Sequence, residues 1–251
     1  MSETALQVVQ RLVVLSGGDD VRRKAAARVL AQLDPTGATA LLHEVQVLAR
    51  KGRKDAAEAL HAFSRALELE ALAIPHIELL RRAANLSGTV TVELLFSEGE
   101  AAMAYDASAA ARADAKLFSQ PLGVLKSRAR LTQNPDEMAR FAVASNAAVV
   151  RELLRNARLT EDVVVRIAAR RPARPEPLVE IWRSDRWTTR PAVRRALAFN
   201  PYLPVDVGAR IVPLLSRAEL IELSKDNSVH PSLKEQATVL LAAGVTSPGG
   251  G

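Results

Sequence analysis

Apolar residues recur every three or four positions along most of the first 85 residues, which is the spacing of a helix with one buried face. In residues 4–15 these positions are Leu6, Val9, Leu12 and Val13. The polar segment SGGDD, residues 16–20, ends this helix, and we expect Asp19 or Asp20 to cap the next one. The pattern therefore predicts two successive amphipathic helices at the start of the sequence.

Proline and glycine set the boundaries of the helices that follow. The segment Asp-Pro-Thr at 34–36 ends the second predicted helix and begins the third. Gly52 separates the third helix from a long one over about 54–73, and Pro75 opens another. We thus predict four or five helices before residue 85.

Residues 89–96, TVTVELLF, alternate between apolar and polar side chains in the manner of a strand. Since the rest of the sequence offers this segment no partner strand, we predict a helix there. The next segment, 97–116, is small and polar and has few large apolar side chains. We predict that it is a linker or a loosely packed helix at a domain boundary.

From about residue 131 the sequence repeats a short unit in which one helix stops and another begins. The copies are NARLTEDV at 156–163, RPARPEPL at 171–178, NPYLPVDV at 200–207 and NSVHPSLK at 227–234, with Asn134-Pro135 as a weaker fifth. Asparagine tolerates the conformation that closes a helix, and the following proline cannot continue it. A later Pro or Thr, such as Thr160, then starts the next helix. The irregular spacing of 15 to 29 residues suits solenoid repeats.

The segments NARLTEDVVVRIAARRP and ALAFNPYLPVDVGARIVPLLSRAELIELSKDNSVHPSLKEQA resemble the leucine-rich repeat variant and HEAT-like alpha solenoids of bacteria. More narrowly, they are similar to a largely uncharacterised group of proteobacterial helical-repeat proteins. The resemblance covers about residues 118–245, with irregular spacing and with Arg171 in the place of an asparagine. Because such solenoids act as rigid binding surfaces, the resemblance implies a scaffold or adaptor.

Composition agrees with a helical fold, since 48% of the residues are apolar and only 4% are aromatic. A core built from Ala, Leu and Val allows helices to approach closely. We predict an all-α, right-handed alpha solenoid of stacked helical hairpins. Its predicted parts are an N-terminal helical region (1–96), a possible linker or loosely packed helix (97–116), a helical-repeat region (117–245) and a disordered tail (246–251).

The sequence contains no motif for several classes of chemical site. Cysteine is absent, which excludes disulfides and thiolate zinc sites and suits a reducing compartment. There is no basic leader and no run of 18 uncharged apolar residues, so we expect a cytoplasmic protein that does not span a membrane. The four histidines form no His-x-x-x-His pair, and neither a Gly-x-Ser-x-Gly elbow nor a phosphate-binding glycine loop occurs. We expect no metal, no cofactor and no enzymatic activity, with a dispersed catalytic site as a third alternative.

Positive charge is concentrated in the middle of the sequence. The net charge is +6, yet residues 122–195 alone hold 16 Lys+Arg against 8 Asp+Glu, and fifteen of those cations are arginine. Two plain explanations are a composition bias toward arginine and the favourable position of cations in the last turn of a helix, as for Arg166, Arg170 and Arg171. A general bias would spread arginine along the whole sequence, so we favour a functional basic surface over solvated charge.

Stacked repeats would bring arginines that are distant in sequence onto one face. The predicted contact residues are Arg151, Arg155, Arg170, Arg171, Arg174, Arg183, Arg186, Trp187 and Arg190. Guanidinium groups suit carboxylate or phosphate, so the predicted ligand is an acidic protein partner, and the alternative is nucleic acid with Trp187 available for stacking. The tryptophans could instead fill gaps in the core.

Overall fold

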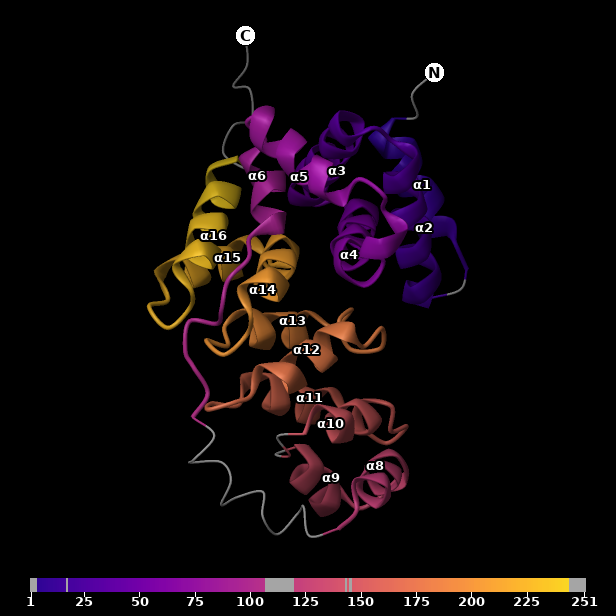
Figure 1. Ribbon diagram of the computed structural model, residues 1–251, viewed down its shortest axis with the longest axis vertical. Helices are drawn as coiled ribbons and strands as arrows, with labels where there is room; N and C mark the ends of the chain where they lie inside the picture. Colours follow the sequence, from indigo (N-terminus) through magenta and orange to yellow (C-terminus); the bar gives the residue numbers. More distant parts are fainter. Residues whose placement is uncertain (1–3, 17, 107–119, 143, 145, 244–251) are drawn as a thin grey trace. The chain divides into compact units, whose positions relative to one another are not determined.

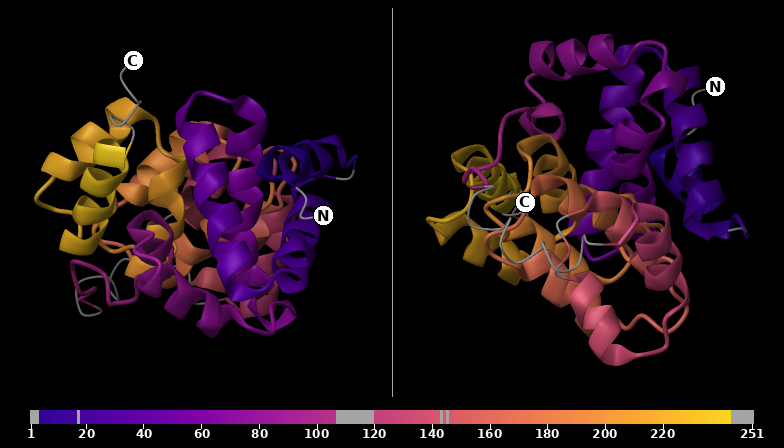
Figure 2. Two further views of the ribbon diagram at one scale, coloured as in Figure 1. Left: turned by 90° about the horizontal axis from the view of Figure 1, so that it is seen from above. Right: turned by 60° about the horizontal axis from the view of Figure 1, so that its bottom comes forward.

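The structure, a computed structural model, describes residues 4–16, 18–106, 120–142, 144 and 146–243. In these residues all regular secondary structure is helical (Figure 1), and the two further views show the same architecture (Figure 2). The prediction of an all-α fold is therefore confirmed for this part of the sequence. The predicted tail, 246–251, and residues 107–116 of the predicted linker lie outside the described residues.

The described residues form two compact units. The first unit consists of residues within Met1–Glu98, Ala209–Lys225 and Ser232–Gly251, and the second consists of residues within Gly99–Gly208 and Asp226–Pro231. The predicted repeat region thus contributes residues to both units.

Helix α4 forms the centre of the first unit. The helices of this unit before residue 98 are α1 (Ala5–Val14), α2 (Gly18–Gln32), α3 (Pro35–Arg50), α4 (Lys54–Leu69), α5 (Ile77–Leu86) and α6 (Val90–Glu93), with short 3-10 turns η1 (Ala71–Ala73) and η2 (Leu94–Phe96). Helix α4 packs against α1, α2 and α3, and its Phe63 and Ala66 are fully buried. The later helices are α15 (Arg217–Lys225) and α16 (Pro231–Ala243), preceded by the 3-10 turn η3 (Val212–Leu214).

The ends of these helices follow the boundary signals in the sequence, with corrections. The long helix predicted over about 54–73 ends at Leu69, and the helix predicted to open at Pro75 begins at Ile77. Asp34 caps α3 by accepting a hydrogen bond from the Gly37 backbone N–H at 3.3 Å, and Gly52 follows α3 with a positive φ of 84°. Asp19 and Asp20 do not cap α2, because that helix already begins at Gly18 and places both carboxylates in its first turn. Residues 90–96 are helical, as predicted for the alternating segment.

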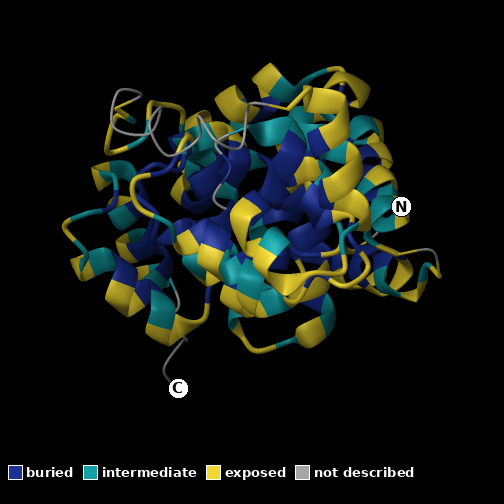
Figure 3. Ribbon diagram, turned by 90° about the horizontal axis from the view of Figure 1, so that it is seen from below, coloured by how far each residue is buried: buried dark blue, intermediate teal, exposed yellow. Residues whose placement is uncertain are grey.

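The second unit is built from short helices packed in two rows. Its helices are α8 (Leu122–Leu131), α9 (Pro135–Ala142), α10 (Ala147–Leu154), α11 (Glu161–Ala169), α12 (Pro175–Arg183) and α13 (Pro191–Ala198), and the boundary between the units falls within α14 (Val205–Ile211). One row contains α8, α10 and α12, in which α10 contacts both neighbours, and the other row contains α9, α11 and α13, in which α11 does the same. Helices of eight to ten residues are too short to be stable alone, so they depend on this packing. Buried residues lie between the helices and exposed residues on their outward turns (Figure 3).

Buried asparagines connect successive helices within a row. Asn156, which follows α10, donates from its side-chain nitrogen to the carbonyls of Ala129 and Thr132 at the end of α8, at 3.0 and 2.9 Å. Asn200 follows α13 and binds the carbonyls of Ala168 and Arg170 at the end of α11 in the same way, at 2.7 and 3.0 Å. The last carbonyls of a helix have no partner within the helix, so each asparagine supplies donors that those carbonyls need.

In the structure, two copies of the repeat unit begin one residue earlier than the sequence alignment places them. The side-chain oxygens of Asn156 and Asn200 accept the backbone N–H two residues later, at 2.8 and 3.0 Å, and a helix begins five residues after each. Asp226, not Asn227, makes the equivalent bond to Ser228 at 2.8 Å, and α16 begins five residues after it. Arg170 holds the matching position before α12.

Candidate functional site

The structure divides the predicted contact residues between the two ends of helix α11. Arg151, Arg155, Arg183, Arg186, Trp187 and Arg190 belong to the ends of α10 and α12 and to the loop that follows α12. Arg170, Arg171 and Arg174 lie in and beside the loop between α11 and α12. Since α11 has nine residues, it separates these loops by about 13 Å. The predicted residues therefore form two groups.

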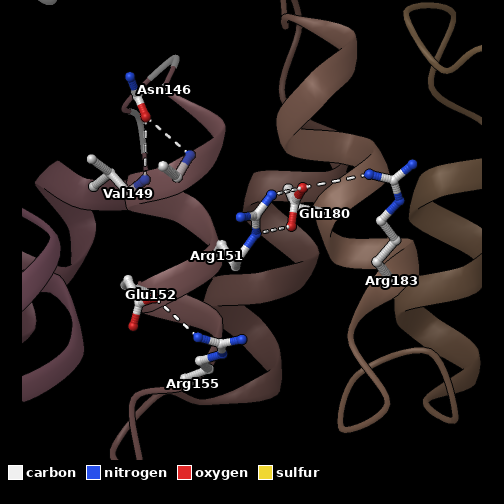
Figure 4. A network of polar contacts seen from close by, with 8 residues as sticks. Asn146, Val149, Arg151, Glu152, Arg155, Glu180 and Arg183 are labelled. Atoms are coloured by element: carbon white, nitrogen blue, oxygen red, sulfur yellow. Dashed lines mark hydrogen bonds and ion pairs between the residues drawn. The ribbon is translucent and has the colours of Figure 1, made fainter.

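A pocket lies between the ends of α10 and α12. Its volume is ≈ 530 Å³, and it is lined by Arg151, Leu154, Arg155, Glu180, Arg183, Ser184, Asp185 and Arg186. Four arginines against two carboxylates give this lining a net formal charge of +2. Figure 4 shows Arg151 of α10 pointing toward Glu180 of α12, and Arg155 beside Glu152 of its own helix.

Glu180 positions the arginines of the pocket. Its side chain is 8% exposed, and its two oxygens accept hydrogen bonds of 2.6 Å from Nε and Nη2 of Arg151. This forked hydrogen bond raises the pKa of the Arg151 guanidinium above its ordinary value. Nη1 of Arg183 lies 3.8 Å from the Glu180 oxygen that Nη2 of Arg151 contacts, so two guanidinium groups converge on one atom.

Arg155 is held at the edge of the pocket by its own helix. Its Nη1 donates to Glu152 at 3.0 Å, and Arg130 on α8 lies 3.6 Å from the other oxygen of the same carboxylate. The Arg155 side chain is 57% exposed, whereas that of Glu152 is 13% exposed. The carboxylate thus restrains Arg155 while leaving most of its guanidinium accessible.

Arg186 binds backbone carbonyls of the loop that follows α10. Its Nη1 donates to the Asn156 carbonyl at 2.7 Å and its Nη2 donates to the Leu159 carbonyl at 3.1 Å. Its guanidinium carbon lies 4.3 Å from the centre of the Trp187 ring, within the range of a cation–π contact. This arginine therefore connects the loop after α12 to the loop after α10.

Trp187 is an interior residue, which corrects the expectation that it could stack on a ligand. It is 3% exposed, and its indole N–H donates to the Leu154 carbonyl at 2.9 Å. Trp182 is fully buried as well. Both tryptophans fill the core of the Ala-rich unit, which is the other role open to them from the sequence.

The second group of arginines is also engaged with the fold. Arg171 donates to the Phe199 carbonyl at the end of α13, and the guanidinium of Arg174 lies 5.2 Å from the centre of the Tyr105 ring. Tyr105 belongs to a described segment whose Met103 backbone N–H donates to the Pro201 carbonyl at 3.0 Å. Arg170 is partly buried in the same loop.

Arg190 lies next to the first group, at the start of α13. Its side chain is 58% exposed, and Nε is 3.9 Å from a carboxylate oxygen of Glu161, the first residue of α11. Such a long, exposed ion pair contributes little to stability. Arg190 therefore remains accessible beside the pocket.

Sequence reasoning missed the carboxylates that organise the arginines. Glu180 lies within PEPLVEIWR, between the buried residues Leu178 and Ile181. A carboxylate inside a buried helix face needs a cationic partner, and that signal was available in the sequence. Its partner, Arg151, is 29 residues earlier, and only the packing of α10 on α12 brings the two together.

The described ranges contain neither a metal-binding cluster nor a membrane-spanning helix. No group of three or more His, Asp or Glu residues there is arranged to hold a metal ion. In the same residues no helix is both long and apolar enough to cross a bilayer.

Comparison with known proteins adds no assignment. No family model matches the chain, and searches of curated proteins and of solved structures found no match. The resemblance to helical-repeat proteins therefore stays a prediction from sequence.

Proposed function

We propose that this protein is a non-enzymatic cytoplasmic scaffold whose second unit binds an acidic protein partner around the pocket between α10 and α12. The observation that carries the proposal is the net charge of +2 in a pocket whose four arginines come from two packed helices and one loop. Buried Glu180 and partly buried Glu152 hold Arg151 and Arg155 in place, so little side-chain entropy is lost when a ligand binds them.

We also propose that the two rows of helices belong to an alpha solenoid of the HEAT or leucine-rich repeat variant type. Support comes from the packing of each helix on the helix two positions before it, and from the asparagines that bind the preceding helix end in each row. In such an architecture each repeat contacts its neighbours, and the surface it presents is rigid. Rigidity suits a scaffold, because the recognising groups keep fixed distances.

An acidic protein fits the pocket better than a nucleic acid does. Trp187 is buried, so it offers no ring to a base, and readers of single strands generally stack bases on several rings. A protein partner can place one acidic group in the pocket and polar groups around it.

Capture from a nuclease-treated lysate tests the proposal. The test variant replaces Arg155, Arg183 and Arg190 by Gln, three exposed residues at or beside the pocket. The control variant replaces Arg140, Arg158 and Arg166 by Gln, which removes the same charge from exposed positions that do not line it. We expect the native chain and the control to retain the same acidic proteins and the test variant to lose them.

Two results would contradict this function. Equal loss of capture in both variants would mean that the arginines act only as diffuse charge. Capture that disappears with nuclease treatment, together with duplex DNA binding that weakens steeply with salt, would replace the proposal with nucleic-acid binding.

A further inference from the structure

The charge balance of the pocket narrows the chemistry of its ligand. Arg151 and Glu180 neutralise each other through their forked hydrogen bond. The remaining charged lining residues are Arg155, Arg183, Arg186 and Asp185. Glu152 binds Arg155, but it is shared with Arg130, so two positive charges are still in excess around the pocket. A ligand group with a charge of about −2 balances that excess, whereas a carboxylate or a phosphodiester, with one charge, leaves half of it.

Fixed hydrogen-bond donors remain for such a group. Arg151 uses Nε and Nη2 on Glu180, and Nη1 has no hydrogen-bond partner among the described residues. Arg155 uses only Nη1, on Glu152, which leaves Nε and Nη2 without a partner in the same part of the chain. Since Glu180 and Glu152 restrain both guanidinium groups, these donors are oriented before a ligand arrives.

We infer that the pocket between α10 and α12 receives a phosphomonoester on a side chain of the acidic partner, an inference that rests on the proposed function. A phosphomonoester carries about −1.5 to −2 charge at neutral pH and presents three acceptor oxygens, which matches both the charge and the free donors. The volume of ≈ 530 Å³ is within the range of pockets that enclose ligands, about 300–1,000 Å³, so it leaves room for the phosphorylated side chain.

Fluorescence anisotropy with three peptides tests the inference on the full chain. The probes are labelled glutamate-rich decapeptides that are identical except for a central phosphoserine, serine or glutamate. At about pH 7.5 we expect the phosphoserine peptide to bind about tenfold more tightly than the other two. This advantage should shrink toward about pH 5.5, because the second pKa of the phosphate is about 6 and protonation removes one charge.

Matched variants locate the binding. Arg155→Gln and Arg183→Gln should each remove most of the phosphoserine advantage, because both residues line the pocket. Arg158→Gln, an exposed arginine outside the lining, should retain it. Circular dichroism spectra and urea midpoints close to those of the native chain would show that the three variants are folded.

Other outcomes overturn the inference without deciding the proposed function. Equal affinity for the phosphoserine and glutamate peptides, lost in both pocket variants, would leave an acidic-partner site with no preference for phosphate. Competition by inorganic phosphate or free phosphoserine as strong as that by the peptide would mean a site for small phosphates. Absence of binding to all three peptides would also overturn the inference, and lysate capture would still test the scaffold function separately.

Discussion

Arginine side chains in the second unit bind two kinds of acceptor, backbone carbonyls and carboxylates. Arg186 and Arg171 donate to carbonyls at helix ends, which otherwise lack partners. Arg151 and Arg155 bind carboxylates and keep donors to spare. Part of the arginine excess is therefore explained by the corners of the fold, and a further part, Arg151, Arg155 and Arg183, lines the pocket between α10 and α12.

Replacing Arg151 with Gln should destabilise the protein, because it leaves the Glu180 carboxylate buried without its forked partner. We expect a loss of about 1–2 kcal/mol, below the cost of breaking a fully buried pair, since the Arg151 side chain is 50% exposed. The double variant with Glu180→Gln should lose less than the two single variants together. Urea denaturation of all four proteins measures this coupling, and strictly additive losses would contradict it.

Asn156→Ala should be among the more damaging substitutions of a polar residue in the second unit. It removes two hydrogen bonds to the end of α8 and one to the Arg158 backbone, and it leaves buried carbonyls without donors. We expect a loss of about 2–3 kcal/mol. Asn134→Ala is the control, because Asn134 is exposed and its side chain makes a single bond, to the Asp136 N–H. Similar denaturation midpoints for the two variants would show that the hydrogen bonds of the Asn156 side chain contribute nothing to stability.

At the scale of helices, apolar spacing and the positions of proline, glycine and aspartate predicted most boundaries of the first unit. These signals are local, because each acts on the backbone within about one turn. The register of the repeats was harder to predict, since Asp226 accepts the backbone N–H with a carboxylate oxygen where Asn156 and Asn200 use an amide oxygen. Alignment by residue type therefore selects Asn227. Only the hydrogen bond to the Ser228 backbone identifies Asp226 as the residue equivalent to Asn156 and Asn200.

Two glycines in open surroundings should respond to alanine with opposite signs. Gly52 follows α3 with φ of 84°, and Gly123 is the second residue of α8 with no positive φ, while a Cβ at either position would meet no atom within 4 Å. Gly52→Ala should lower the free energy of unfolding by about 1 kcal/mol, because alanine is strained at a positive φ. Gly123→Ala should raise the free energy of unfolding by up to about 0.5 kcal/mol, because helix propensity counts for less in the first turn than in the middle of a helix. Thermal or urea unfolding measures both, and a shared sign would contradict the role given to the Gly52 backbone.

Across the whole molecule, the sequence predicted a helical architecture and the location of the charge, but not how the charge is divided. Two arginines lie on the same surface only if their loops are at the same end of the helices. The irregular spacing of the repeats does not determine at which end each loop lies. Arg171 and Arg183 are only twelve residues apart, yet α12 separates them. The pocket similarly depends on the packing of α10 against α12, so neither helix alone contains the site.

The distribution of charge makes a kinetic prediction for the complete chain. Residues 122–195 hold 16 cations against 8 anions, so their field should accelerate the approach of an acidic peptide, while the pocket should hold the peptide after contact. The Arg140/Arg158/Arg166→Gln variant should therefore lower the association rate about twofold at low salt and leave the dissociation rate unchanged. The Arg155/Arg183/Arg190→Gln variant should also raise the dissociation rate about tenfold, because it removes donors at and beside the pocket. Stopped-flow measurements with the phosphoserine peptide give both rates. Repeating them at high salt, which suppresses long-range electrostatic attraction, separates that attraction from the contacts in the pocket. If both variants changed the two rates alike, the pocket would be no more than a part of the positive field.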